Sequence, residues 1–334
     1  MQGARIAAAA ALTLAGAGAA VGAQAPDSET RHCKSGATSA RIGGAHACLN
    51  AGQRCKKRHD GAYHRYRFHC HSGRLTRFRR PKGPPKPPTL PEPPKPTGRL
   101  IDVGGYRLLL ECVGTAPPTV VFESGATASR FGARKVQYAL RPNTRVCTYD
   151  RPGTVGGASD ARPASVPPTS ETFASELHTV LANANVPGPY VLVGSSFGGL
   201  LISTFTARYP QDVVGLVYLD ALAPGSAEGY LQLGPLPEPW DGLADLDRLR
   251  GLSFGSRPVV VLATQNPGQS ADIRGRGTNV IVAEAPQYGH VVVLIAPGLA
   301  YEAIRVAVKA VKAGVPAPRC AQTPLAPLVR RCTP

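Results

Sequence analysis

Several features are scarce in this 334-residue chain, and each scarcity narrows what the protein can be. Beyond residue 25 no apolar run is long enough to cross a bilayer, which excludes a transmembrane segment in the mature chain. None of the eight cysteines forms a C-x-x-C pair, which disfavours a zinc site. Residues 26–99 hold four Asp or Glu against 17 Lys or Arg, so most of the net charge of +17 belongs there. Only two histidines, His178 and His290, follow residue 99, so a catalytic imidazole in that part is one of these two.

The first 25 residues have the pattern of an export signal. Arg5 gives a basic start, a run rich in Ala, Leu and Val follows, and Ala23-Gln24-Ala25 ends it as a cleavage site. A short membrane anchor is the alternative, but small residues dominate the run and no basic stop-transfer segment follows it. The sequence therefore predicts a signal peptide over residues 1–25 and a protein that is secreted or associated with the cell surface.

Residues 26–80 are predicted to form a basic accessory module rich in cysteine and histidine. An even number of cysteines in an exported chain predicts disulfides, with a zinc site as the alternative. A module of this size needs such cross-links because its hydrophobic core is small. Its positive charge predicts that residues 30–80 bind an anionic surface polymer, whereas nucleic acid is the less favoured partner. The four cysteines are Cys33, Cys48, Cys55 and Cys70.

Two further segments follow. Residues 81–97 carry nine prolines, which predicts a semi-rigid polyproline linker. Over residues 98–334 short apolar runs alternate with helical periods, and eight of these runs are predicted strands, the first two joined by a turn at Gly104-Gly105. Such alternation predicts an α/β domain with a mostly parallel, eight-stranded sheet and helices on both faces.

The stretch YVLVGSSFGGLLISTFTARYP, residues 190–210, carries the strongest functional pattern. A short apolar run meets Gly194-Ser195-Ser196-Phe197-Gly198, and a helical segment follows. This is the strand–turn–helix context in which G-x-S-x-G presents a nucleophilic serine. The turn is sharp enough to strain the serine backbone, and glycines supply the room around it. Ser196 stands at the apex, while Ser195 occupies an x position; an ordinary Gly-rich turn is the alternative.

Together with three other motifs, this stretch gives residues from about 98 to 314 a resemblance to the alpha/beta-hydrolase superfamily, in particular to its serine esterase-like and peptidase-like members. The order and spacing of all four motifs agree with that family. The motifs are VVFESG at 120–125, YDRPGT at 149–154, VLVGSSFGG at 191–199 and YGHVVVLIAP at 288–297.

The resemblance implies roles for individual residues. Ser196 is the expected nucleophile and His290 the general base, whereas His178 lies on an apolar helix face and is expected to pack there. The acid is ambiguous: most relatives place it after the seventh strand, where this chain reads ATQNP. Asp220, at the end of the sixth strand, is favoured, Asp272 is the alternative, and neither is a third possibility. The oxyanion hole is expected from the N–H groups of Ala126 and Phe197, with no metal or organic cofactor. Asp150, Arg151 and Gly153 are expected to brace this loop.

The remaining features concern substrate and stability. Residues 222–256 are predicted to form a small lid over the acyl pocket, with a plain structural helix as the alternative. In the family's fold Cys112 and Cys147 lie on neighbouring strands and are expected to be bonded, while Cys320 and Cys332 are expected to close the tail. The predicted function is a secreted serine hydrolase that cleaves an ester or related acyl bond of a small or peptide-like substrate. The alternatives are an aminopeptidase-like serine peptidase and a non-catalytic binding protein on a hydrolase fold.

Overall fold

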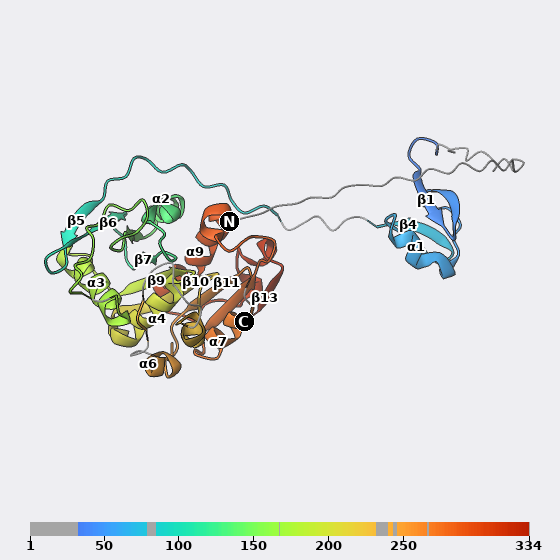
Figure 1. Cartoon of the computed structure of the whole chain (residues 1–334). Coiled ribbons are helices and arrows are strands. Elements are labelled where there is room, and N and C mark those ends of the chain that lie inside the picture. Colours follow the sequence, from blue (N-terminus) through green and yellow to red (C-terminus); the bar gives the residue numbers. More distant parts are fainter. Residues whose placement is uncertain are drawn as a thin grey trace, which may run out of the picture. The chain divides into compact units, whose positions relative to one another are not determined.

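A computed structural model describes residues 33–78, 85–166, 168–231, 240–242, 246–265 and 267–333 (Figure 1). The predicted signal peptide lies outside the described residues. The chain divides into two compact units, Met1–Pro81 and Lys82–Pro334. Within the described residues no helix has the length and apolar character needed to span a membrane.

The first unit consists of two hairpins and a short helix around a small core. Both hairpins are antiparallel, and the core is formed by Ala40, Leu49, Tyr63, Phe68 and Leu75. Disulfides join Cys33 to Cys48 and Cys55 to Cys70. Among the described residues one cluster, Cys33, His46 and Cys48, has metal-compatible spacing, but its two sulfurs are bonded to each other. The elements are β1 (Thr38–Ile42), β2 (Ala45–Leu49), α1 (Asp60–His64), β3 (Phe68–His71) and β4 (Arg74–Arg77).

The second unit is built on one central sheet, which contains nine strands in the described residues. Their order is β13-β12-β11-β10-β9-β7-β8-β6-β5. The pairs from β8 through β7, β9, β10 and β11 to β12 are parallel, and β5, β6 and β13 pair antiparallel. The strands are β5 (Arg99–Asp102), β6 (Arg107–Val113), β7 (Thr119–Glu123), β8 (Arg145–Tyr149), β9 (Tyr190–Ser195), β10 (Val213–Leu219), β11 (Val259–Ala263), β12 (Val280–Glu284) and β13 (Arg331–Thr333).

The mostly parallel sheet is confirmed, but the predicted count of eight strands is one too low. The additional strand is β13, which pairs antiparallel with β12 at the edge of the sheet. The disulfide between Cys320 and Cys332 ties this short strand to the preceding turn. Three residues without a clear apolar alternation carry almost no strand signal, so the pairing depends on the tertiary contact.

Helices cover both faces of the sheet, as predicted (Figure 1). Because side chains alternate along a strand, β9 contributes Val191 and Val193 to the core beneath α2, α8 and α9, and Leu192 to the core beneath α3 and α4. The helices are α2 (Arg134–Leu140), α3 (Ser170–Asn183), α4 (Gly198–Arg208), α5 (Ala227–Leu231), α6 (Leu246–Arg250), α7 (Pro267–Arg274), α8 (Val292–Ile295) and α9 (Pro297–Ala313).

The Pro-rich segment has no helix or strand from residue 85 to 97, as its composition predicts, but it does not stand clear of the second unit. Leu90 packs against the core, and the carbonyl oxygen of Pro94 accepts a 2.7 Å hydrogen bond from Arg134. Gly298 lies so close to Pro88 that a methyl group there would overlap the Pro88 backbone. This part of the segment therefore belongs to the second unit.

The second disulfide of this unit crosses the sheet. Cys112 and Cys147 are directly opposed on β6 and β8, with their Cα atoms 4.1 Å apart. All eight cysteines are thus paired. The two pairs in the second unit are those that the sequence analysis expects.

Candidate active site

Ser196 stands at the turn between β9 and α4. Its φ angle of 52° lies in the left-handed region, which is unfavourable for a residue with a side chain. The two neighbouring glycines are needed because no side chain fits at their positions. A Cβ on Gly198 would overlap the carbonyl group of Glu123, and one on Gly194 would lie 2.6 Å from the Gly198 oxygen. The backbone is therefore forced into a sharp elbow that lifts the hydroxyl above the sheet edge.

His290 connects this serine to an aspartate. It lies in the loop between β12 and α8, and its Nε2 atom is 2.8 Å from the Oγ atom of Ser196. Its Nδ1 atom is 2.7 Å from the Oδ2 atom of Asp220. The three residues follow β9, β10 and β12, whose carboxyl ends meet at one edge of the sheet because these strands are parallel.

Asp220 is fixed by the end of β11, where the sequence offered no acid. Its Oδ1 atom accepts hydrogen bonds from the N–H groups of Thr264 at 2.6 Å and Gln265 at 3.0 Å. The side chain is 1% exposed, and its φ of 45° is again left-handed. The strand end that carries the acid in most relatives thus supplies two donors that hold the carboxylate on the neighbouring strand.

The structure does not bring the other two candidates to Ser196. Asp272 lies in helix α7, where it pairs with Arg276 at 2.8 Å and accepts the N–H of Gly225 at 3.0 Å. Its carboxylate therefore ties α7 to the start of the 222–256 segment. His178 stacks on Tyr209 with ring centroids 4.2 Å apart, which is the packing role that its helix face predicts.

The charges within the site fix the protonation of the pair. Burial alone raises the pKa of Asp220, but the hydrogen bonds from His290, Gln265 and Thr264 outweigh it and lower the pKa. The hydrogen bond to Asp220 raises the pKa of His290 above its ordinary value of 6.5, against a smaller opposing effect of burial. Asp220 is therefore ionised near neutral pH and stabilises a positive charge on the imidazole.

The loop after β7 faces the serine and is held by Arg151. A Cβ on Gly125 would be 3.3 Å from the Ser196 Cβ, so this loop lies directly against Ser196. The guanidinium of Arg151 donates to the carbonyl oxygens of Ser124 at 3.0 Å and Gly125 at 2.7 Å. Since C=O and N–H point in opposite directions across a trans peptide, this grip turns the Ala126 N–H away from Arg151.

The Arg151 side chain is itself fixed by a buried acid. It pairs with Glu123 at 2.8 Å, both side chains being 2% exposed, and Glu123 also accepts a hydrogen bond from Tyr149. The guanidinium carbon lies 5.8 Å from the centre of the Phe197 ring. Arg151 therefore contacts Phe197 and the Gly125–Ala126 peptide group, which carry the two candidate oxyanion donors. Sequence reasoning missed Glu123, although an acid at the end of an otherwise apolar strand was a usable signal.

Part of the 222–256 segment packs on Phe197. Tyr230 stacks on the Phe197 ring at 5.2 Å, and Trp240 meets it edge-on at 5.6 Å. The indole N–H of Trp240 donates to the Ser170 hydroxyl at 2.7 Å, which anchors the segment to α3. Residues 232–239 and 243–245 of the predicted lid lie outside the described residues.

Five exposed apolar side chains come from a helical turn, a loop and helix α8, close to the loop after β7 and to His290, and we call them the apolar mouth. Val155 donates its N–H to Thr127 of the oxyanion loop at 3.3 Å, and the Leu294 side chain lies against Gly132. Ile295 lies against Gly289, which precedes the histidine. Their exposures run from 46 to 74%. The mouth consists of Phe131, Val155, Val291, Leu294 and Ile295.

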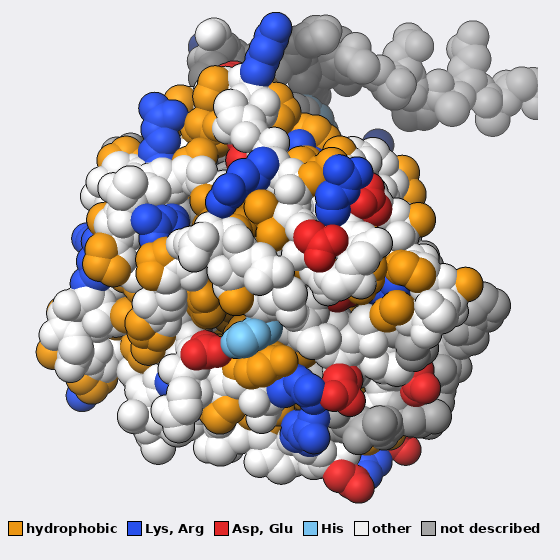
Figure 2. Space-filling model, turned by 90° about the vertical axis from the view of Figure 1, so that its left-hand side faces the viewer, with side chains coloured by type: hydrophobic (Ala, Val, Ile, Leu, Met, Phe, Trp, Pro, Cys, Tyr) orange, Lys and Arg blue, Asp and Glu red, His pale blue; other side chains and the backbone are white. Residues whose placement is uncertain are grey.

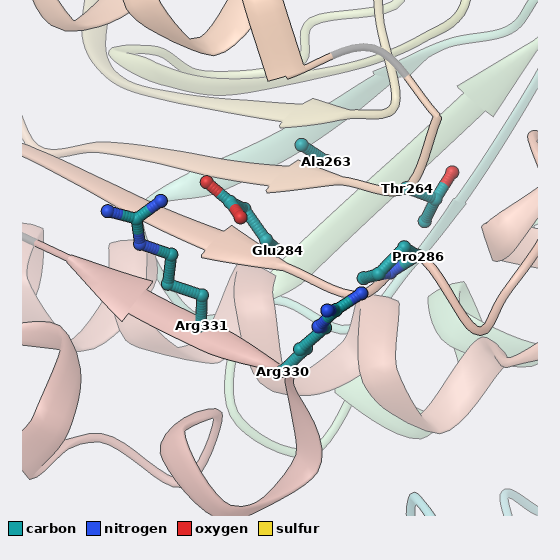
Figure 3. Close-up of a pocket in the computed structure, with 6 residues that line it drawn as sticks. All are labelled: Ala263, Thr264, Glu284, Pro286, Arg330 and Arg331. Atoms are coloured by element: carbon teal, nitrogen blue, oxygen red, sulfur yellow. The ribbon is translucent and has the colours of Figure 1, made fainter.

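A separate hollow of about 440 Å³ lies at the carboxyl ends of β11 and β12 and at the start of β13. Figure 3 shows Glu284 and Arg331 reaching toward the same side of the sheet, with Thr264 across from them. The hollow does not include Ser196 or His290 in its lining. It shares Thr264 with the hydrogen-bond shell of Asp220, so it is a neighbour of the candidate site rather than the site itself.

Comparison with known sequences decides the family. Residues 120–308 match the family model described as "Alpha/beta hydrolase family". The chain belongs to this family. Among curated relatives, it is 32% identical over 107 residues to an AB hydrolase superfamily protein of Gibberella zeae, a match that covers 31% of this chain and 32% of that protein. It is 42% identical over 82 residues to an uncharacterised protein of Schizosaccharomyces pombe, covering 25% and 15%. The chain thus spans less than a third of the length of these relatives.

Solved structures resemble this chain in fold. Cfl2 from Burkholderia cenocepacia superimposes with a TM-score of 0.51 at 21% identity, covering 62% of this chain and 94% of that one. A proline iminopeptidase from Mycobacterium smegmatis gives a TM-score of 0.52 at 16% identity, covering 65% and 99%. Both confirm the arrangement of strands and helices.

Proposed function

We propose that this protein is a secreted serine hydrolase that cleaves an ester or related acyl bond through Ser196, His290 and Asp220. The observation that carries the proposal is the continuous hydrogen-bonded chain from the Ser196 hydroxyl through His290 to Asp220. Serine is a weak nucleophile at neutral pH unless an adjacent base takes its proton, and this chain places the base within reach.

The chemistry follows from these positions. Ser196 attacks the acyl carbon while His290 takes its proton, and Asp220 stabilises the imidazolium that forms. The oxyanion is bound by the N–H groups of Ala126 and Phe197, the latter opening helix α4, where N–H groups lack helical partners. His290 then protonates the leaving group. In the second step His290 takes a proton from a water molecule, whose oxygen attacks the acyl carbon; the bond to Ser196 breaks, the Ser196 oxygen takes the proton from His290, and the carboxylic acid is released.

The surroundings of the site support an ester with an apolar group. The apolar mouth offers contact area to an acyl or alkyl chain, and the segment with Tyr230 and Trp240 closes one side of Phe197. Secretion is supported by the signal pattern of residues 1–25 and by the pairing of all eight cysteines. The serine peptidase alternative uses the same residues, and substrate tests distinguish the two.

A fluorophosphonate probe tests the proposal because it reacts covalently only with an activated serine. We expect wild-type protein to be labelled on the peptide that contains Ser196, and Ser196→Ala to remain unlabelled. We also expect turnover of p-nitrophenyl esters to exceed that of aminoacyl p-nitroanilides. Absence of label from folded wild-type protein would favour the non-catalytic alternative, and faster anilide turnover would favour the peptidase.

The pH profile reports on His290. The proposed base must be neutral to accept a proton, so kcat/KM should fall about tenfold per pH unit below its pKa. Because Asp220 raises that pKa, the midpoint of the acid limb is expected above 6.5. Initial rates on a p-nitrophenyl ester at constant ionic strength measure it. A midpoint below 6.5 would contradict the assignment of His290 as base with Asp220 as its partner.

A further inference from the structure

The described part of the first unit carries far more positive than negative charge. Its described residues, 33–78, contain ten Lys or Arg and one acid, Asp60. That carboxylate is engaged inside the unit: it accepts the N–H of Cys70 at 2.6 Å and lies 3.4 Å from His64. The second unit differs, since residues 100–334 hold 20 basic and 17 acidic residues. On the face drawn in Figure 2, side chains of both signs are interspersed with apolar ones.

Part of this charge surrounds a hollow. A cavity of about 420 Å³ is lined by Thr38, Arg65, Tyr66, Arg67, Arg77 and Phe78. All three arginines are exposed, and none of them forms an ion pair with another described residue of the chain. The hollow thus presents three guanidinium groups to solvent without a carboxylate among its lining residues.

The walls of the hollow are held in place by contacts that leave the charges available. Arg77 donates to the Thr38 hydroxyl at 2.8 Å, and its guanidinium lies 5.2 Å from the centre of the Phe68 ring. Arg67 has a left-handed φ of 66° and accepts the N–H of Phe78 at 2.8 Å through its carbonyl oxygen. The Tyr66 hydroxyl accepts the Arg41 N–H at 3.0 Å. These contacts fix the backbone around the hollow.

We infer that this hollow is a binding site for an anionic polymer of the cell surface, a glycan that carries carboxylate or phosphate groups. Planar guanidinium groups match such oxyanions because each offers two parallel donors. A polymer engages several cations at once and releases its counterions, which suits a unit with ten positive side chains.

The aromatic residues favour a glycan over nucleic acid. Binding of single strands relies on a series of exposed aromatic faces on which bases stack. Here Tyr63 and Phe68 are 7% and 0% exposed and belong to the core of the unit. Phe78, 41% exposed, is packed against the rings of His64 and His69, with centroids 5.0 and 4.7 Å away.

Fluorescence anisotropy with labelled polymers tests the site in the full mature chain. The probes are a polygalacturonate, a phosphomannan and a single-stranded oligonucleotide of equal charge. The triple variant Arg65→Gln, Arg67→Gln, Arg77→Gln removes the hollow's cations. The matched control, Lys34→Gln, Lys57→Gln, Arg58→Gln, removes the same charge at exposed positions outside the hollow.

We expect wild-type protein to bind at least one of the two glycan probes, and the polymer bound identifies carboxylate or phosphate as the ligand group. The hollow variant should weaken that binding by about tenfold or more, and the control by only about two- to threefold. Thermal unfolding measured by circular dichroism verifies that both variants are folded. If both triple variants weakened polymer binding equally, net charge alone would account for the binding. If the oligonucleotide bound more tightly than either glycan, the unit would be assigned to nucleic acid. Either result overturns the proposal.

Discussion

Replacing Asp220 by Asn is expected to lower kcat by about 10⁴-fold while the fold is retained. The amide keeps the shape of the side chain and can still accept the N–H groups of Thr264 and Gln265. It no longer favours the imidazole tautomer that presents a bare Nε2 to Ser196, and it cannot stabilise the imidazolium. Steady-state kinetics on a p-nitrophenyl ester measures the loss, and the acid limb of the pH profile should move to lower pH.

Asp272→Asn is the matched control, because it changes the other candidate acid in the same way. Asp272 pairs with Arg276 and binds Gly225, so its loss should lower stability by about 1–3 kcal/mol and leave kcat within about threefold. A large loss of kcat from the Asp272 change, with a small loss from the Asp220 change, would reverse the assignment.

Replacing Arg151 by Lys is expected to lower kcat by about 10²-fold with a small change in KM. A lysine keeps one positive charge beside Glu123, but it lacks the fork that reaches two carbonyl oxygens at once. The peptide that carries the Ala126 N–H is then free to turn, and loss of one oxyanion donor costs about 10²–10³-fold. Affinity for a trifluoromethyl ketone, which forms an oxyanion on Ser196, should fall by the same factor as kcat.

Arg162→Lys provides the comparison for this positioning residue. Arg162 also forms a largely buried pair with an acid, Glu176 at 2.8 Å, and also lies over an aromatic ring, that of Phe173 at 4.7 Å. Arg162→Lys should lower the free energy of unfolding by about as much as Arg151→Lys does. It should leave the ratio of ketone affinity to substrate affinity unchanged. If both lysine variants change that ratio equally, Arg151 has only a structural role.

Local patterns were sufficient to predict much of this protein. Each of the eight strands from β5 to β12 coincides with a short apolar run. The sharp turn at Ser196 is recognisable from the glycines that its geometry requires. His290 could be selected by counting, because only one other histidine lies in that unit. These features depend on residues that are close in sequence, so the sequence contains them directly.

Other features depend on residues that are distant in sequence. The choice between Asp220 and Asp272 was open until the fold placed one carboxylate beside His290, 70 positions away, and the other beside Arg276. The same holds for Glu123, which becomes a partner of Arg151 only when β7 and β8 pair. A carboxylate beside a cation forms an ion pair, as Asp272 does, whereas a carboxylate beside a histidine orients the imidazole, as Asp220 does. Sequence position alone does not distinguish these two environments.

The amino-acid order by itself thus determined the alternation of strands and helices, the glycine-lined turn at Ser196, the position of His290 after the last parallel strand and the charge difference between the two units. Only the tertiary structure decided which aspartate meets the histidine, that β13 extends the sheet, that the Pro-rich segment lies on the second unit, and that Tyr63 and Phe68 are buried in the first. The reason is physical. Periodicity and turn chemistry act over a few residues, whereas hydrogen-bond partners and burial are set by contacts between segments that meet only in the folded chain.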